Sequence, residues 1–324
     1  MFSTTSTLFM GSLSFHRESW HGTPPPYRDV VEFFFFPAHR GTQIVLDDNT
    51  GSIQSLNRVS QWVDLAKGHE DAKHEHASFY PTRLLKLGSS VSETICLCVT
   101  KECAIEGEYA TLSHCWGSGQ PTKLETDNLE IMKSGITVSS LPRTFRDAIV
   151  VARHLNIEYL WIDSLCIIQN SSEDWQTEVQ LMEAVYSNSC CNIAASHSIN
   201  GDGGLFVNRD PYFTTALEVR AEWDNVEHQN IVLHPSDFWA TRIGNAPLNK
   251  RGWVLQERVL APRTIHFTHD QIIWEAQTER ACKIYFDEFT RASPYEALWG
   301  TSGASILDLQ KLESDLVTLY TCWF

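Results

Sequence analysis

One carboxyl group stands on a helical face that is otherwise apolar, and it has the clearest chemical content in the sequence. A helix is expected from Asp174 to about Tyr186, and the side chains that share one of its faces are Trp175, Glu178, Val179, Met182, Val185 and Tyr186. Burial raises the pKa of a carboxyl group, which suits Glu178 to acid–base catalysis or to binding a sugar hydroxyl. The competing interpretation is a partly solvated glutamate near a helix N-terminus, where the helix dipole favours negative charge.

A nucleophile and a base are adjacent in the run Ser113, His114 and Cys115. Neighbouring side chains on a strand point to opposite faces, so these residues cannot form a catalytic pair among themselves. Cys166 and His197 are expected to approach from adjacent strand ends. Packed or hydrogen-bonded residues are the favoured interpretation, and thiol catalysis is the alternative.

An acidic residue, Asp163, interrupts an apolar strand-like run. Its charge must be satisfied, either by capping a helix or by pairing with an arginine such as Arg143, Arg209 or Arg251. A structural role is favoured over catalysis at this position.

The segment 251–258 (RGWVLQER) places Trp253, Gln256 and Glu257 within one and a half turns of an expected helix. The favoured interpretation is a helix that docks through Trp253 and Leu255, with Glu257 paired to Arg251 or Arg258.

Alternating elements position these residues. Strands are expected at 109–116, 159–168 and 190–196, and helices at 141–155 and 174–186. This β-α-β-α-β order, with nearly continuous apolar strands, predicts an α/β fold with a parallel sheet and flanking helices. Ligands of such sheets bind beyond the carboxyl ends of the strands, where Ser113 to Trp116, Asp163 to Cys166, Ser196 and His197 are expected.

The flanking parts carry weaker patterns. We expect an irregular N-terminal region at 1–80, an α/β domain at 81–276 and a C-terminal extension at 277–324 that is either naturally short or truncated. Within the domain, a strand is expected at 231–234, a helix at 248–260, and a β-hairpin that turns at His269 and Asp270.

Composition excludes several functions. The net charge of the 324 residues is −15 and no basic run occurs, which disfavours nucleic-acid binding. No apolar stretch approaches the roughly 20 residues of a membrane span. Nine cysteines, an odd number, indicate reduced thiols and a cytoplasmic protein. Cys96 and Cys98 lack zinc-ligand spacing, so no metal is expected. The segment 117–123 lacks phosphate-loop spacing and no G-x-G-x-x-G opens a helix, so no resident cofactor is expected.

Three blocks of the sequence resemble the fungal heterokaryon incompatibility (HET) domain. The blocks are 109–117 (YATLSHCWG), 160–206 (from LWIDSLCIIQ through DWQTE to GLF) and 251–267 (from RGWVLQER to PRTIHF). The lead-in 81–85 (PTRLL) is also similar to one common before this domain. The resemblance covers about 80–276.

The resemblance implies a fungal protein of non-self recognition, an effector of programmed cell death that acts with an incompatibility or signalling partner protein and self-associates. The family has been compared with TIR domains, whose flavodoxin-like fold agrees with the expected order of elements. Some TIR domains cleave NAD with a helical glutamate. By this analogy Glu178 is the catalytic residue, NAD or another nucleotide is the substrate, and the substrate-binding residues are Ser113, His114, Trp116, Asp163 and Trp175.

The sequence departs from the family pattern at Ala276, where a cysteine is common, and in the missing Cys/His cluster before the lead-in. Two alternatives to a nucleotide hydrolase remain open. One is a non-enzymatic interaction and oligomerisation module, and the other is a HET-like protein of a metabolite gene cluster that acts on a small molecule.

Overall fold

The structure is a computed structural model in which two compact units are distinguished. It describes residues 9–15, 29–37, 46–69, 79–119, 122–210, 217–221, 229–235, 237–276 and 280–282. The larger unit spans Gln43–Ala216 and Ala240–Phe289 and contains every residue that the sequence analysis assigned to a site.

The smaller unit contains a four-stranded antiparallel sheet in the order β1-β2-β10-β9. Its strands are β1 (Phe9–Phe15), β2 (Asp29–Pro37), β9 (Leu217–Ala221) and β10 (Gln229–Pro235). The strand expected at 231–234 is confirmed as part of β10. Strands β1 and β2 lie in the region expected to be irregular, and β2 takes in the short apolar run 33–36.

The larger unit is built on a nine-stranded sheet in the order β13-β12-β11-β8-β5-β7-β3-β4-β6. Its strands are β3 (Arg83–Lys86), β4 (Thr94–Val99), β5 (Tyr109–Ser113), β6 (Ile136–Thr137), β7 (Tyr159–Ile162), β8 (Asn192–Ala194), β11 (Arg263–Phe267), β12 (Ile272–Ala276) and β13 (Arg280–Cys282). The central strands β11, β8, β5 and β7 are parallel neighbours. The predicted α/β fold with a parallel sheet is therefore confirmed, with antiparallel strands added at both edges.

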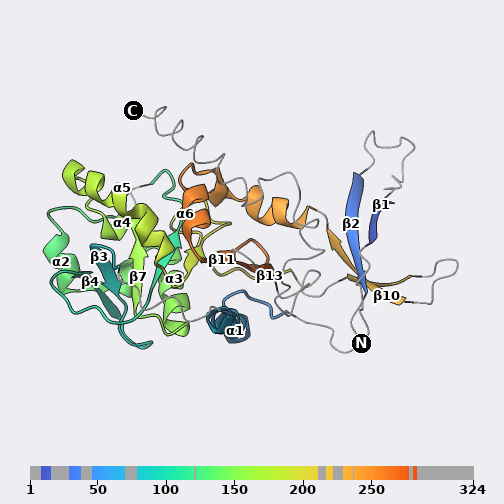
Figure 1. Ribbon diagram of the computed structural model, residues 1–324, viewed down its shortest axis with the longest axis horizontal. Coiled ribbons are helices and arrows are strands. Elements are labelled where there is room, and N and C mark those ends of the chain that lie inside the picture. The colour runs from blue at the N-terminus through green and yellow to red at the C-terminus, as the bar shows by residue number, and fades with distance from the viewer. Residues whose placement is uncertain are drawn as a thin grey trace. The chain divides into compact units, whose positions relative to one another are not determined.

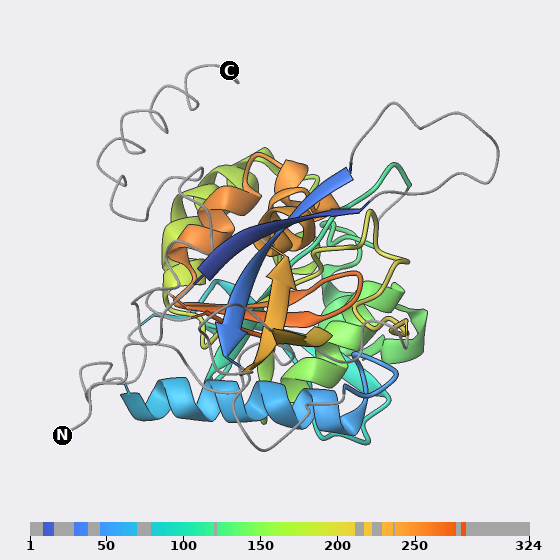
Figure 2. The ribbon, with the colours of Figure 1, turned by 90° about the vertical axis from the view of Figure 1, so that its right-hand side faces the viewer.

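Helices cover both faces of this sheet. They are α1 (Ile53–His69), α2 (Leu129–Ser134), α3 (Arg143–His154), α4 (Asp163–Cys166), α5 (Ser172–Ser187) and α6 (Val254–Leu260). In the two ribbon views, α5 and α6 lie on one side of the strands, and α1 and α3 lie on the other (Figures 1 and 2). The hydroxyl oxygen of Ser171 accepts a hydrogen bond from the amide of Asp174 at 3.2 Å and so caps the N-terminus of α5.

Two local predictions were wrong. The strand expected at 159–168 ends at Ile162, because the carboxylate of Asp163 accepts the amide of Ser164 at 2.6 Å and begins the short helix α4. The N-terminal region is not irregular throughout, since α1 places Leu56, Val59 and Trp62 in the core at helical spacing.

Candidate functional site

Three distant segments converge on one carboxylate at the carboxyl edge of the parallel strands. The Nε2 atom of His114 lies 3.1 Å from Oδ1 of Asp163, and the indole nitrogen of Trp116 donates to Oδ2 at 3.0 Å. The guanidinium of Arg251 lies 3.8 Å from the same Oδ2. We call His114, Trp116, Asp163 and Arg251 the Asp163 cluster. Of the three arginines considered as partners for Asp163, the structure therefore selects Arg251.

The chain after β5 is held in place by close packing. The rings of His114 and Trp116 are parallel, with centroids 6.4 Å apart, and the edge of Phe145 contacts His114 at a centroid distance of 4.8 Å. Arg251 also donates to the carbonyl of His114. At Gly117, φ is +74° and an added Cβ would lie 2.5 Å from the Cβ of Asn200, so only glycine fits this turn.

Electrostatics keep Asp163 ionised. Burial would raise the pKa of this carboxyl group, but His114 and Arg251 outweigh the burial and the pKa is lowered. The side chain of Asp163 is 20% exposed and that of Arg251 is 27% exposed. Both charged groups can therefore be reached from solvent.

A second carboxyl group, Glu257 on α6, lies beside the Asp163 cluster and has the opposite tendency. Glu257 is 4% exposed, and burial raises its pKa against the influence of Arg251. It interacts with the hydroxyls of Ser113 and Tyr186, and its Oε2 has no hydrogen-bond partner among the described residues. The raised pKa favours the neutral acid.

The sequence analysis assigned Glu257 only to an ion pair. The expected docking of this helix through Trp253 and Leu255 was wrong, because both side chains are exposed and the buried residues of α6 are Val254 and Glu257. Their spacing of three residues was the available signal for a buried carboxyl group. Ser113 also donates to the side-chain oxygen of Asn192 at 3.1 Å.

The predicted burial of Glu178 is confirmed, since its exposed fraction is 1%. Burial raises the pKa of Glu178, opposed by a hydrogen bond from Thr82 and by Arg83, whose Nη1 lies 3.7 Å from Oε1. Arg83 pairs with Asp174 as well, through two of its nitrogens. The Cys166 thiol lies within electrostatic range of both Glu178 and Asp163. Glu178 is therefore close to the cluster, although its described contacts are with Thr82 and Arg83.

Trp175 lies elsewhere. Its side chain is 43% exposed, and the structure does not bring it into the Asp163 cluster. The apolar face predicted for this helix begins one turn later, because the buried residues of α5 are Glu178, Val185 and Tyr186.

The thiols of Cys115 and Cys166, near the carboxyl edge of the parallel strands, are buried and unreactive. Burial raises the pKa of Cys115 and raises that of Cys166 to about 12, so both are protonated at neutral pH. His197 is held by the carbonyl of Phe267, with 3.1 Å between that oxygen and Nδ1. These environments agree with the favoured interpretation of packed residues.

A buried hydrogen-bonded relay joins the strands next to the cluster. The hydroxyl of Ser196 lies 3.2 Å from Nδ1 of His266, and Nε2 of His266 lies 3.0 Å from the carboxylate of Glu275. Arg258 binds this carboxylate with two nitrogens, at 2.5 and 2.7 Å. The relay links the segment after β8 with β11, β12 and α6, and Arg258 pairs with Glu275.

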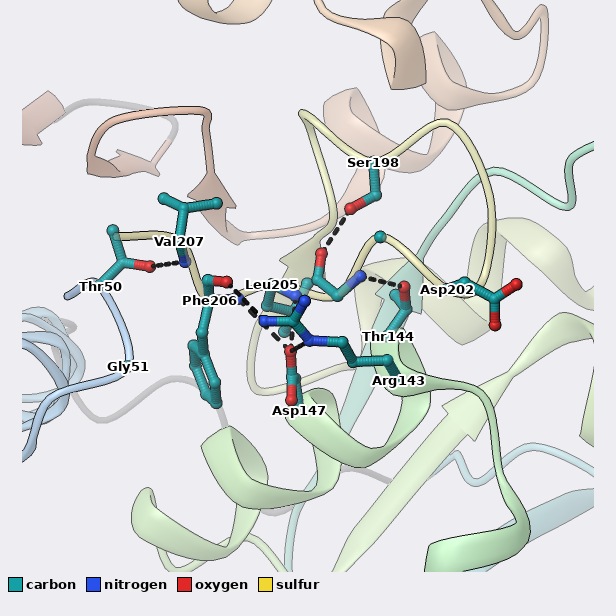
Figure 3. Close-up of polar contacts among 12 residues, drawn as sticks. Thr50, Gly51, Arg143, Thr144, Asp147, Ser198, Asp202, Leu205, Phe206 and Val207 are labelled. Atoms are coloured by element: carbon teal, nitrogen blue, oxygen red, sulfur yellow. Dashed lines mark hydrogen bonds and ion pairs between the residues drawn. The ribbon is translucent and has the colours of Figure 1, made fainter. Parts of the chain in front are cut away.

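A glycine-containing loop is anchored to α3 by hydrogen bonds (Figure 3). The amide of Leu205 donates to Asp147 at 2.8 Å, the amide of Gly204 donates to Thr144 at 3.1 Å, and Arg143 donates to the carbonyl of Phe206 at 3.0 Å. At Gly204, φ is +75° and an added Cβ would lie 2.7 Å from Arg143 and Asp147. The motif 204–206 is thus explained by the folding of this loop.

Within the described part of the chain, no three His, Cys, Asp or Glu side chains are arranged to hold a metal ion. No helix among the described residues is long and apolar enough to cross a membrane.

Comparison with known proteins gives one match. Residues 109–257 match the family model described as "Heterokaryon incompatibility protein (HET)", which confirms the resemblance and includes the whole Asp163 cluster and Glu257. No curated protein and no solved structure matches the chain.

Proposed function

We propose, from the match of residues 109–257 to the HET family model, that the protein is an effector of heterokaryon incompatibility that cleaves the N-glycosidic bond of NAD or a related nucleotide. The observation that supports this proposal best is the pair of carboxyl groups at the sheet edge with opposite tendencies. Against the effect of burial, His114 and Arg251 lower the pKa of Asp163, whereas burial raises the pKa of Glu257 and the charge of Asp163 raises it further.

Such a pair is what glycosidic chemistry requires. When nicotinamide leaves, the ribose acquires positive charge, which a nearby carboxylate stabilises, while a neutral acid of raised pKa exchanges protons with the substrate or water. Asp163 is the accessible carboxylate. Glu178, the residue indicated by the TIR analogy, carries the same role in our proposal only if the packing around it opens, because its exposed fraction is 1%.

The surroundings of Asp163 offer binding groups for the rest of a dinucleotide. The half-buried indole of Trp116 provides a surface on which a base can stack. Arg251, which is 27% exposed and donates to the carbonyl of His114, and the exposed turn 117–119 that follows Trp116 are each suited to binding a diphosphate. Of the other expected binding residues, Ser113 and His114 are each 1% exposed and position Glu257 and Asp163 from beneath, whereas Trp175 lies outside the Asp163 cluster.

The test is nicotinamide release from NAD by the purified full chain, at concentrations that span its self-association. Turnover should fall by at least about 100-fold in Asp163→Asn and in Glu257→Gln, since removal of one such catalytic group costs on this order, whereas a fall in Glu178→Gln alone would assign the carboxylate role to Glu178. Asp202→Asn is the matched control, because Asp202 is exposed and its side chain points away from the anchored loop (Figure 3). Unchanged turnover in both site variants, or none in the wild type in any assembled state, would refute the proposal.

A second candidate function is a non-enzymatic interaction module, and the exposure of Trp175 favours it. A tryptophan that is 43% exposed on a surface helix is typical of a residue that a partner covers. In this case Trp175→Ala abolishes self-association or toxicity on overexpression, whereas Asp163→Asn leaves both unchanged.

A further inference from the structure

Three cysteines lie on strand β4 and on the turn that follows it, away from the Asp163 cluster. Cys96 and Cys98 lie on β4, and Cys103 follows a turn in which the amides of Glu102 and Cys103 donate to the carbonyl of Val99 at 2.9 and 3.1 Å. This turn folds the chain back on the end of the strand. The free thiols differ in access, because Cys98 is buried, Cys96 is half-buried and Cys103 is exposed.

The thiols lie on the face of β4 that is turned away from the core. Ile95 and Leu97 belong to the hydrophobic core, and side chains alternate along a strand, so Cys96 and Cys98 share the opposite face. The Cys98 thiol interacts with the thiols of both Cys96 and Cys103. Cys98 is thus the central member of the group.

We infer that this group is an oxidisable site at which a hydroperoxide joins Cys98 to Cys103 in an intrachain disulfide. The alternative bond between Cys96 and Cys98 is disfavoured by strand geometry. Residues two apart on a strand are separated by about 6.6 Å, whereas the Cβ atoms of a disulfide lie about 4 Å apart. The turn 99–103 reverses the chain between Cys98 and Cys103, so strand geometry does not keep these two Cβ atoms apart.

The reaction has two steps. The exposed sulfur of Cys103, as its thiolate, attacks one oxygen of the hydroperoxide; the O–O bond breaks, and the sulfenic acid forms as the other oxygen leaves as water or an alcohol. The sulfur of Cys98 then attacks the sulfenic sulfur; the S–S bond forms, the S–O bond breaks, and the leaving oxygen takes the Cys98 proton and departs as water. Two thiols are oxidised and one peroxide is reduced.

The position of this site gives the modification a structural consequence. Cys98 pairs with Leu84 and Val99 pairs with Arg83 in the antiparallel register of β4 and β3. Arg83 is the residue that binds Asp174 and lies next to Glu178. The disulfide therefore fixes the turn beside the strand that positions the N-terminal part of α5. Burial raises the pKa of Cys98 to about 12, so its oxidation should speed up as the pH rises.

The test is peptide mapping of the full chain after treatment with hydrogen peroxide and alkylation of the remaining thiols. Trypsin cuts after Lys101 and so separates peptide 87–101, with Cys96 and Cys98, from peptide 102–123, with Cys103. We expect these two peptides to be linked, about 2 Da lighter than their sum, and separated by a reductant. The link should persist in Cys96→Ser and disappear in Cys98→Ser and Cys103→Ser.

Buried thiols provide the internal control. Cys115, which lies on peptide 102–123, and Cys166 should not be oxidised by the peroxide. In treated and untreated protein alike, both thiols should react with the alkylating reagent only after the protein is unfolded. The inference is overturned if the bond forms within peptide 87–101, if the link survives in Cys103→Ser, or if Cys103 is converted to sulfinic or sulfonic acid while Cys98 stays reduced.

Discussion

Replacing Asp163 by asparagine is the perturbation that should disturb the larger unit most selectively. The carboxylate accepts from the amide of Ser164 and the imidazole of His114 at Oδ1, and from the indole of Trp116 at Oδ2, where Arg251 also approaches. Asparagine keeps one acceptor oxygen and replaces the other by an amide group that only donates. In either orientation of the asparagine, its NH2 group must face hydrogen-bond donors, either those at Oδ1 or those at Oδ2 of the original carboxylate.

The magnitude follows from these contacts. Hydrogen bonds to a charged group contribute about 1.5–3 kcal/mol each, and the partial exposure of Asp163 favours the lower part of this range. A loss of about 2–3 kcal/mol corresponds to a decrease in Tm of about 4–12 °C for a unit of this size. Thermal unfolding at pH 7 measures this difference, with Asp202→Asn as the control that should leave Tm unchanged.

The dependence on pH gives a second check of the same variant. The pKa of Asp163 is lowered by folding, so its contribution is present above the unfolded value of about 3.9 and is lost as the pH falls through the folded value. The Tm difference between wild type and Asp163→Asn should therefore persist at pH 7 and narrow below about pH 4. A decrease in Tm under about 2 °C at pH 7, or a difference that grows in acid, would refute this reasoning.

Three further predictions concern the residues around the site. Glu178→Gln should leave Tm at pH 7 unchanged or raise it. Folding raises the pKa of Glu178, so the stabilising contribution of this group is present below the unfolded pKa of about 4.3 and is lost as the pH rises through the folded pKa. A decrease in Tm by calorimetry as large as that of Asp163→Asn would contradict this. Arg83→Met should cost about 3–5 kcal/mol in urea unfolding, since it leaves Asp174 and Glu178 without their cation, whereas Lys86→Met on the same strand, where the side chain is exposed, should cost little. Gly204→Ala should lower Tm by about 4 °C or more because of its positive φ and the contact with Arg143 and Asp147, and Gly119→Ala, with open space around its Cβ, serves as the comparison; equal Tm values for the two variants would count against the anchoring of this loop.

The sequence predicts the central elements well because each has a strong local pattern. Strand β5, helix α3 and the β11–β12 hairpin occupy the expected segments, since continuous apolar runs and helical spacing are determined by a few neighbouring residues. The Ser171 cap and the burial of Glu178 follow from the same local rules. The apolar residues of helix α1 have an equally clear helical spacing. The helix was missed because the polar segments on either side of it led the whole region 1–80 to be expected as irregular.

The composition of the site depends on contacts that no local pattern specifies. Asp163 meets His114, Trp116 and Arg251 only because β5, β7 and the segment before α6 end at the same edge of the sheet. The choice among three arginines and the neutral tendency of Glu257 follow from this tertiary arrangement. Trp175 is exposed for a related reason, because the first turn of α5 is turned outward while the next turn packs on the sheet.

We propose that the carboxyl edge of β5 and β7 binds a nucleotide. Amide hydrogen exchange of the full chain with and without NAD tests it most directly, since it reports binding at each segment whether or not turnover follows. With NAD, exchange should be slower in residues 113–119 and 163–166 of the wild type, and this protection should be absent in Asp163→Asn. Identical exchange in both segments with and without saturating NAD would contradict it.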